Sequence, residues 1–310
     1  MKKTLIALLI AIHAFTNAQD AYFVNNQNSL LLINPSFAGS NGGIRNLVNY
    51  RNQWPSLSGT YVTFFNSFDA YIKPIKGGVS LNLYSDDQAR GTLRTTAISL
   101  AYAQHFSLLE NKLNIIPSVQ FGYFKKTLDR SRLNFGDPIN SNGTVVWSNP
   151  TVVPKASISN YDIGAGLLLN YKNTYFGVST FHINQPDEGL MGFSKLPFRL
   201  NIHASHNYIM NENVLLHFYS QLSKQAMFNM LKFQVNALLY KHLITSVGIT
   251  NNSAYIFGAG YRYNYFTVLL NYDQIFSELS GNTAGSWELS ASYNLRNKEN
   301  RKTITNLERW

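Results

Sequence analysis

Alternation of apolar and polar residues with a period of two is the feature that most constrains how this chain can fold. From 287 to 295 every odd position is apolar or aromatic and every even position is polar. The stretches 79–83, 200–205, 231–237 and 266–273 largely follow the same rule. Because successive side chains of a strand point to opposite faces, each stretch predicts a strand with one apolar and one polar face.

About 14 such segments can be traced, each near the roughly 9–11 residues of a tilted membrane strand. The expected strands lie at 44–54, 61–72, 76–85, 95–106, 113–126, 160–171, 174–184, 197–210, 213–223, 229–241, 242–251, 254–264, 265–275 and 285–296. Beyond residue 18 no apolar run reaches the roughly 18 residues that a membrane helix needs.

The connections between the expected strands alternate in length. Short turns are expected at 73–76, 110–112, 172–173 and 211–213, and longer connections at 52–60, 85–94, 127–159 and 185–195. Short periplasmic turns, longer outer loops and an even strand number are typical of bacterial outer-membrane barrels. Lipid tolerates no unpaired strand edge, so the sequence predicts an all-β fold, a closed antiparallel transmembrane β-barrel over 44–296.

A soluble β-sandwich or propeller is the alternative, and composition disfavours it. Only 14% of the residues are charged, against about 25% in ordinary soluble domains. Aromatic residues also recur near the expected strand ends, where interfacial girdles form in membrane barrels. These aromatic residues are Tyr50, Trp54, Tyr71, Tyr84, Phe106, Tyr171, Tyr175, Tyr240, Tyr255, Tyr265, Phe276 and Trp287.

The amino-terminal end has the pattern of an export signal. Lys2 and Lys3 precede an apolar stretch over 5–15, and small residues follow at 16–18. This predicts a cleaved signal peptide, residues 1–18, and localisation in the outer membrane after export. The apolar run is too short for an anchoring helix. The chain has no cysteine, which excludes disulfides, cysteine-based metal or redox sites and a lipidated cysteine.

Small polar residues dominate the expected inward face of the barrel, including Ser80, Asn82 and Ser290. They leave room in the lumen for water or for another segment. Residues 19–43 precede the first strand and carry too little charge for a solvated tail, so they are the candidate periplasmic or plug segment.

The basic excess is spread along the chain. The formal net charge is +10, and loss of residues 1–18 would lower it to +8. Lysines gather at expected periplasmic turns, so we expect no nucleic-acid partner. A basic periplasmic tail, 297–310, follows the last strand and is either a solvated end or a docking peptide for a partner. The tail residues singled out are Arg296, Lys298, Arg301, Lys302, Arg309 and Trp310.

No sequence motif points to catalysis. The nucleophile-elbow, phosphate-loop and zinc motifs are absent. His203 and His206 are three residues apart, which places them on opposite faces of a strand. His105, His182 and His217 stand singly on expected strands. We therefore expect no enzyme activity, cofactor or metal, although a Ser/His site assembled across strands stays open.

Several short motifs occur in a fixed order between about 19 and 295. They are Asn34-Pro35-Ser36-Phe37-Ala38-Gly39, Tyr50-Arg51-Asn52-Gln53-Trp54, Ser67-Phe68-Asp69, Gly77-Gly78-Val79, Ala101-Tyr102-Ala103-Gln104-His105, Phe135-Gly136-Asp137-Pro138, Asp162-Ile163-Gly164-Ala165-Gly166, Tyr175-Phe176-Gly177-Val178-Ser179 with His182, and Tyr272-Asp273 followed by Gly285-Ser286-Trp287-Glu288-Leu289-Ser290 with Tyr293. In these motifs the sequence resembles the PorP/SprF family of outer-membrane proteins of the type IX secretion and gliding machinery.

The resemblance implies a Bacteroidetes-type outer-membrane barrel that helps to secrete or retain a surface protein, such as an adhesin, and contacts the periplasmic machine. Its expected partners are outer-membrane lipid, type IX secretion components and a secreted or surface-anchored client. No catalytic residues come with the family. The motif residues singled out are Asn34, Pro35, Gly39, Arg51, Gln53, Trp54, Ser67, Asp69, His105, Asp162, Asp273 and Glu288.

Physical roles can be suggested for a few of these motif residues. Pro35 and Gly39 would fix a turn in the entry segment. Arg51 could pair with Asp69, and Ser67 would share the inward face with Asp69. The alternative function is an outer-membrane channel or transporter for a small hydrophobic or polar solute, because barrels of this size with an amino-terminal hatch take up such solutes.

Overall fold

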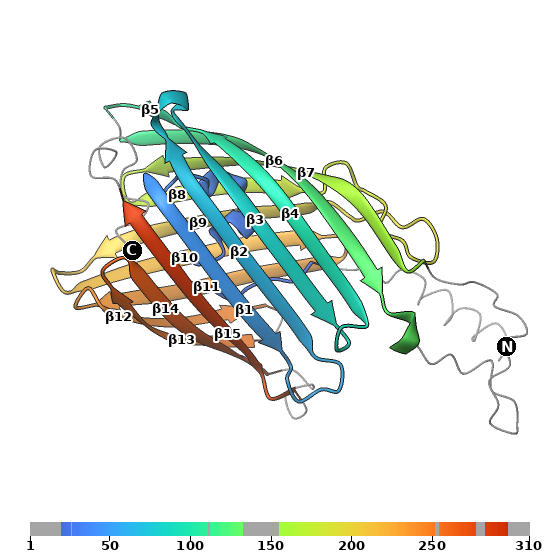
Figure 1. Ribbon diagram of the computed structural model, residues 1–310. Coiled ribbons are helices and arrows are strands. Elements are labelled where there is room, and N and C mark those ends of the chain that lie inside the picture. The colour runs from blue at the N-terminus through green and yellow to red at the C-terminus, as the bar shows by residue number, and fades with distance from the viewer. Residues whose placement is uncertain are drawn as a thin grey trace, which may run out of the picture.

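Antiparallel strands make up nearly all of the regular structure in the computed structural model (Figure 1), which describes residues 20–25, 27–110, 112–132, 155–251, 254–276 and 283–296. The strands are β1 (Gly43–Gln53), β2 (Tyr61–Ile72), β3 (Gly77–Gln88), β4 (Leu93–Gln104), β5 (Phe106–Leu108), β6 (Leu113–Leu128), β7 (Ser157–Tyr171), β8 (Thr174–Phe181), β9 (Arg199–Ile209), β10 (Val214–Gln225), β11 (Phe228–Leu239), β12 (Leu243–Thr250), β13 (Ala254–Tyr263), β14 (Phe266–Ile275) and β15 (Ser286–Arg296). Short helical turns are α2 (Leu30–Ile33), η2 (Pro35–Phe37), η3 (Lys73–Ile75) and η4 (Arg130–Arg132).

The sheet closes on itself. Neighbouring strands along the chain pair antiparallel, β1 also pairs with β15, and β4 pairs with β6. The three-residue β5 continues along β6 beyond a break at His105. Within the described residues, fourteen strands therefore form the closed barrel and β5 is one short extra strand. The predicted closed antiparallel barrel of about 14 strands is confirmed.

Burial follows the period-two pattern of the sequence. In β15, Trp287 and Leu289 are exposed on the outside, whereas Glu288 and Ser290 are buried inside. In β11, Lys232 points inward between the outward Leu231 and Phe233. The apolar set therefore faces lipid and the polar set faces the lumen. No helix among the described residues is long and apolar enough to cross a membrane.

The two ends of the barrel carry different connections. One end, here called the turn rim, holds the turns between β2 and β3, β7 and β8, and β13 and β14; β1 begins and β15 ends there, at the left of Figure 1. At the other end, the loop rim, β1, β6, β8 and β14 end, and the connections 54–60 and 182–198 lie there. By the rule for bacterial barrels, the turn rim faces the periplasm.

Some loop-rim connections are shorter than the sequence suggested. The expected loop over 85–94 is wrong, because β3 and β4 continue pairing until Gln88 lies opposite Leu93. The connection between β10 and β11, residues 226–227, is also shorter than expected. His182, expected inside a strand, follows the end of β8 with a φ of +59°.

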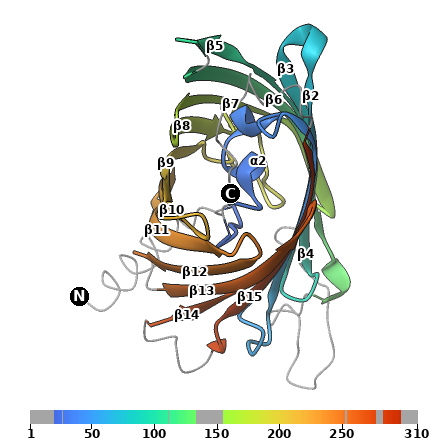
Figure 2. The same cartoon turned by 90° about the vertical axis from the view of Figure 1, so that its left-hand side faces the viewer.

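Residues 20–25 and 27–42, here called the lumenal segment, lie inside the barrel, as the position of α2 in Figure 2 shows. A barrel of about 14 strands has a wider interior than its inward side chains can fill, since about eight strands already suffice for a side-chain-filled core. Near its carboxyl end the segment forms η2, where Asn34 is the cap and Pro35 takes the first helical position. Proline suits that position because its fixed φ is already helical and its missing N–H is not needed there.

Apolar side chains of the lumenal segment pack on apolar residues of the wall. Phe23, Leu31 and Phe37 form one buried cluster with wall residues that include Phe65 and Tyr175. Burying each large apolar side chain contributes about 1.5–3 kcal/mol. The barrel thus has a core inside its lumen.

That internal core corrects two girdle assignments. Tyr175 is only 4% exposed and packs edge-on against Phe37. Tyr84 lines a lumenal cavity. Most of the other expected girdle residues do face outward, namely Tyr50, Phe106, Tyr171, Tyr240, Tyr255, Tyr265, Phe276 and Trp287.

Candidate functional site in the barrel lumen

The lumenal segment crosses the barrel from one rim to the other. Its first described residue, Asp20, contacts His182 and Arg199 at the loop rim. Its last residues precede β1, which starts at the turn rim with Gly43. The functional side chains of the lumen are those that fix this path, and they form three groups.

The first group holds the turn around η2. Asn34 is fully buried; its Oδ1 accepts the Ser36 N–H (2.9 Å). Its Nδ2 lies 3.1 Å from His203 Nε2 on β9 and donates to the Leu167 carbonyl on β7 (3.2 Å). Ser36 Oγ and Ser118 Oγ on β6 are 2.8 Å apart. The capping side chain therefore also ties the segment to the wall.

A buried ion pair completes this group. Arg45 Nε donates to Asp69 Oδ1 (2.8 Å), and the same guanidinium donates to the Phe37 carbonyl (2.9 Å). Asp69 Oδ2 accepts the Gly39 N–H (2.8 Å). His105 Nε2 donates to the Ala38 carbonyl (2.9 Å). Each charge is matched and each end of the turn is bonded, as burial of polar groups requires.

Two glycines allow the segment to lie directly on the wall. Gly39 has a φ of +68°, and a Cβ at Gly78 would lie 2.0 Å from the Ala38 carbonyl oxygen. Only glycine permits such an approach of backbone to backbone. The predicted turn at Pro35 and Gly39 is therefore present, with Gly39 also packed against β3.

The second group is a four-charge cluster. Arg51 Nη2 on β1 donates to Asp273 Oδ2 on β14 (2.6 Å), and Arg51 Nη1 lies 3.7 Å from Glu288 Oε2 on β15. Glu288 accepts the backbone N–H groups of Val24 (2.6 Å) and Asn25 (2.8 Å).

Lys232 on β11 is the fourth member of the cluster. Its Nζ donates to the carbonyls of Phe23 (3.0 Å) and Val24 (3.2 Å), and its side chain is completely buried. Two separate parts of the barrel wall thus hold one short stretch of main chain. The Glu288 carboxylate on β15 accepts from its N–H groups, and the Lys232 ammonium on β11 donates to its carbonyls. Such bonds hold the main chain whatever its side chains are.

The suggested pair Arg51–Asp69 is wrong. In the β1–β2 register Arg45, not Arg51, lies opposite Asp69. Six residues of strand separate the two arginines, which is about 20 Å. Arg51 instead lies opposite Glu288, because barrel closure pairs β1 with β15.

The third group anchors the segment at the loop rim. Asp20 Oδ2 lies 2.8 Å from His182 Nε2 and 3.0 Å from Arg199 Nη1, and His182 Nδ1 lies 2.9 Å from Asp162 Oδ1. Burial disfavours the imidazolium, but the Asp20 and Asp162 carboxylates outweigh it and raise the pKa of His182 to about 9. Burial likewise opposes ionisation of Asp20, yet His182 and Arg199 hold its pKa well below the usual range.

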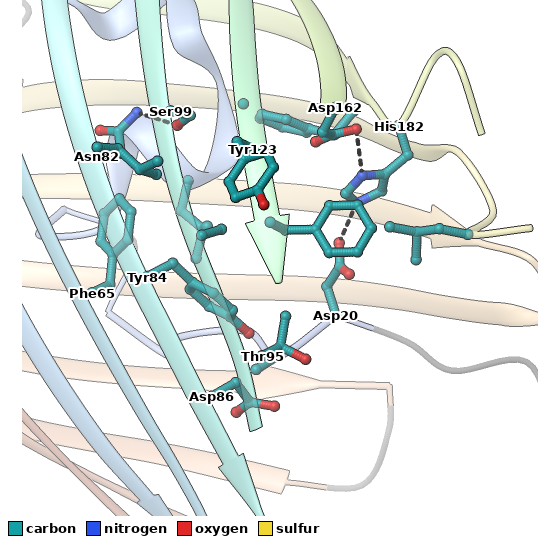
Figure 3. A pocket seen from close by; sticks show the side chains of 18 of the residues that line it. Asp20, Phe65, Asn82, Tyr84, Asp86, Thr95, Ser99, Tyr123, Asp162 and His182 are labelled. Atoms are coloured by element: carbon teal, nitrogen blue, oxygen red, sulfur yellow. Dashed lines mark hydrogen bonds and ion pairs between the residues drawn. The ribbon is translucent and has the colours of Figure 1, made fainter. Parts of the chain in front are cut away.

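A cavity of about 140 Å³ opens beside this anchor, between the lumenal segment and the wall formed by β3, β4 and β6 (Figure 3). Its floor is formed by Leu31 and Leu32 of α2. Asp86 lines the end of the cavity near the carboxyl end of β3, at the bottom of Figure 3. The expectation that Asp86 lies in an outer loop is therefore wrong.

The remaining motif residues lie apart from these groups. Gln53 ends β1, and Trp54 follows with a φ of +56° and an edge-on contact to Tyr61 (5.9 Å between ring centroids). Ser67 is buried and faces inward on β2, on the same face as Asp69. Arg296 ends β15, whereas Lys298, Arg301, Lys302, Arg309, Trp310 and the expected signal peptide lie outside the described residues. Within the described residues, no group of three or more histidine or acidic side chains is arranged to hold a metal ion.

Comparison with known proteins places this geometry in a family. The model of the family described as "Type IX secretion system membrane protein PorP/SprF" matches residues 15–293. The chain belongs to the PorP/SprF family. None of the curated proteins matches this PorP/SprF sequence.

Solved structures similar to this PorP/SprF protein are outer-membrane barrels of low sequence identity. The CymD monoaromatic hydrocarbon channel has a TM-score of 0.53 at 12% identity, over 90% of this chain and 95% of its own. The toluene transporter TodX of P. putida has a TM-score of 0.48 at 12% identity, over 90% and 96%. The Acinetobacter baumannii protein Omp33 has a TM-score of 0.45 at 9% identity, over 81% and 96%. The likeness to CymD shows the fold alone.

Family and fold together make this PorP/SprF protein an outer-membrane β-barrel component of the type IX secretion system. Membership implies contact with other components of that system. A channel for small solutes is not favoured, because the lumenal segment occupies the interior and is bonded to the wall in three places.

Sequence reasoning did not single out four residues of this PorP/SprF site, namely Arg45, Lys232, Asp20 and Arg199. Arg45 and Lys232 did leave a signal, since each is a lone charge at an inward position of an alternating strand. Asp20 and Arg199 left none, because their meeting depends on the path of the lumenal segment.

Proposed function

We propose that the protein acts without catalysis, as a closed-lumen barrel that holds a secreted or surface-anchored client, such as an adhesin, at its loop rim. Its turn rim contacts the periplasmic part of the type IX machine. The observation that supports this proposal is the lumenal segment, which is held by buried charges from β15 and β11. With the interior occupied, the two rims are the surfaces left for partners.

The turn rim fits an acidic partner. Exposed lysines stand on its turns at Lys73, Lys76, Lys112, Lys172 and Lys241. The basic tail after β15, with Lys298, Arg301, Lys302 and Arg309, continues the same charge. In this proposal the tail is a docking peptide for a periplasmic component, and the outward apolar and aromatic side chains contact outer-membrane lipid.

A disulfide lock tests whether the barrel works with its lumen closed. The chain has no cysteine, and Ser36 Oγ and Ser118 Oγ are 2.8 Å apart, so Ser36→Cys with Ser118→Cys can link the lumenal segment to β6 after a small adjustment. We expect locked cells to display the same surface proteins as wild-type cells, measured by surface labelling and mass spectrometry. Each single-cysteine variant is the matched control.

Two outcomes would contradict the proposal. The first is loss of surface proteins in the locked variant that a reductant restores, which would mean that the segment must leave the lumen. The second is an unchanged set of surface proteins after deletion of the gene. Affinity purification of the full-length protein from outer membranes should also recover type IX components, and recovery of none would count against contact at the turn rim.

A further inference from the structure

The cavity beside the loop-rim anchor is built from alternate residues of three neighbouring strands. β3 contributes the four inward positions Asn82, Tyr84, Asp86 and Gln88. β4 contributes 95, 97 and 99, and β6 contributes 120, 122, 124 and 126. Six residues along a strand span about 20 Å. The cavity is therefore a groove along the strands, open toward the loop rim and closed below by α2.

Three buried polar atoms of the lining residues have no hydrogen-bond partner among the described residues: the acceptors Asn82 Oδ1 and Gln120 Oε1, and the donor Arg199 Nε. Asn82 and Gln120 are 4% and 8% exposed. Nδ2 of Asn82 is already bonded to Ser99 Oγ (3.1 Å; Figure 3), which leaves Oδ1 as the unbonded atom of this amide. Buried acceptors left unbonded cost free energy, so the groove suits a ligand that brings donors.

The charges around the groove leave one carboxylate unmatched. Asp20 forms ion pairs with His182 and Arg199, and Asp162 pairs with His182. Glu188 Oε2 lies 2.7 Å from Lys126 Nζ. Asp86, only 4% exposed, accepts hydrogen bonds from Thr63 Oγ1 (2.8 Å) and Gln88 Nε2 (2.8 Å), both neutral groups. Within the described residues no ion pair reaches Asp86. A buried carboxylate is stabilised by a cation, so the groove favours a positively charged ligand.

Apolar side chains also line the groove. They include Leu31, Phe65, Phe124, Phe181 and Leu196. A ligand that fits must therefore combine N–H donors, a cation and apolar parts in a narrow, extended shape. An extended polypeptide with a lysine or arginine flanked by apolar residues has all of these features.

We propose that this groove binds such a basic, apolar-flanked peptide segment of a client protein. The ammonium or guanidinium lies against Asp86, and main-chain N–H groups of the segment donate to Asn82 Oδ1 and Gln120 Oε1. The segment enters from the loop rim and stops at α2. This inference rests on the proposed function, because it names the chemistry of the client at the same rim.

The protein's own basic tail does not compete for the groove. It leaves β15 at Arg296, which pairs with Gly43 at the turn rim. The lumenal segment lies between that rim and the groove. The occupant that we propose is therefore a segment of another molecule rather than the tail.

Peptide binding to the full-length protein in lipid nanodiscs tests the inference. The probes are two fluorescein-labelled, capped hexapeptides with a central lysine or a central glutamine flanked by leucines, followed by fluorescence anisotropy. We expect the wild type to bind the lysine peptide about tenfold more tightly than the glutamine peptide. Asp86→Asn should remove that preference.

Two further variants separate binding from folding. Asp87→Asn changes the next carboxylate, which is bonded to Arg94, and should keep the preference. Gly122→Leu should fill the groove and weaken both peptides at least tenfold, because a Cβ there meets its neighbours only at 3.5 Å and the backbone need not move. Heat-modified migration in gel electrophoresis confirms that each variant barrel is closed.

The outcomes that would overturn the inference are distinct from failure of the proposed function. Equal affinity of the wild type for both peptides, no binding of the lysine peptide, or a preference that survives Asp86→Asn would overturn it. Binding of lipopolysaccharide that Asp86→Asn abolishes would overturn the peptide assignment. In cells, surface proteins lost on gene deletion but retained by Asp86→Asn would overturn the inference alone, whereas surface proteins unchanged by deletion would overturn the proposed function.

Discussion

Replacement of Glu288 by glutamine should release the amino-terminal half of the lumenal segment. The cluster holds two cations, Arg51 and Lys232, against two carboxylates, Asp273 and Glu288, and Glu288 is 0% exposed. Glu288→Gln keeps the size of the side chain and leaves one buried positive charge unmatched. It also replaces one carboxylate acceptor of the Val24 and Asn25 N–H groups by an amide N–H₂ group.

The magnitude follows from the burial of the cluster. Removing one partner of a buried ion pair typically costs about 3–5 kcal/mol. If the segment opens locally, about 4 kcal/mol raises the open population by roughly 10³-fold, since about 1.4 kcal/mol corresponds to tenfold. The barrel strands keep their pairing, so the effect is confined to the lumen.

A single thiol reports this opening. Ser29→Cys introduces the only cysteine of the chain, at a position 1% exposed and hydrogen-bonded to the Asn25 carbonyl. In that background Glu288→Gln should accelerate maleimide labelling by roughly 10³-fold. Glu110→Gln is the matched control, because Glu110 is 89% exposed at a turn and its loss should leave the rate unchanged. An acceleration below about tenfold, with a closed barrel, would refute the view that the charge cluster holds the segment.

Two further predictions concern the ends of the segment. Gly78→Ala should release the turn at Gly39 from the wall, because the new Cβ would lie 2.0 Å from the Ala38 carbonyl oxygen. Gly192→Ala is the control, because a Cβ there meets nothing within 4 Å. Proteolysis of the lumenal segment should be faster in the first variant and unchanged in the second. At the loop rim, the raised pKa of His182 predicts that its ion pairs stabilise the anchored segment by about 3 kcal/mol. This stabilisation is complete below pH 6.5 and is lost as the pH rises through about 9. The lowered pKa of Asp20 predicts that its stabilisation of the anchor is lost only as the pH falls below about 3.8. Protease cleavage near Asp20 should therefore increase above pH 9, and cleavage independent of pH from 6 to 10 would contradict the anchor.

The strands could be predicted from the sequence almost residue by residue. In β15 the alternation of Trp287, Glu288 and Leu289 records directly which side chains face lipid. The loop rim was harder to predict, because Asp86 and Gln88 look like loop residues although they continue the ladder of β3. When one face of a strand lines a water-accessible lumen, polar residues near its end are compatible with either a strand or a loop.

The candidate site was predictable in some of its members but not in its pairings. Arg51, Asp69, Asp273 and Glu288 were singled out because they lie in the family motifs. Their partners depend on strand register and on closure between the first and last strands, which bring Arg51 and Asp273 together across 222 positions of sequence. Strand periodicity carries no information about such distant contacts.

The sequence by itself determined the strands, their faces and therefore a closed barrel in a membrane, because a period of two is a local property that each strand expresses alone. Only the tertiary structure decided that residues 20–25 and 27–42 lie in the lumen, that Lys232 and Glu288 hold their backbone from two separate strands of the wall, and that Asp86 faces a groove without a cation. These contacts arise after the sheet has curved and closed, and the distances across a barrel are set by the number and stagger of its strands rather than by any one of them.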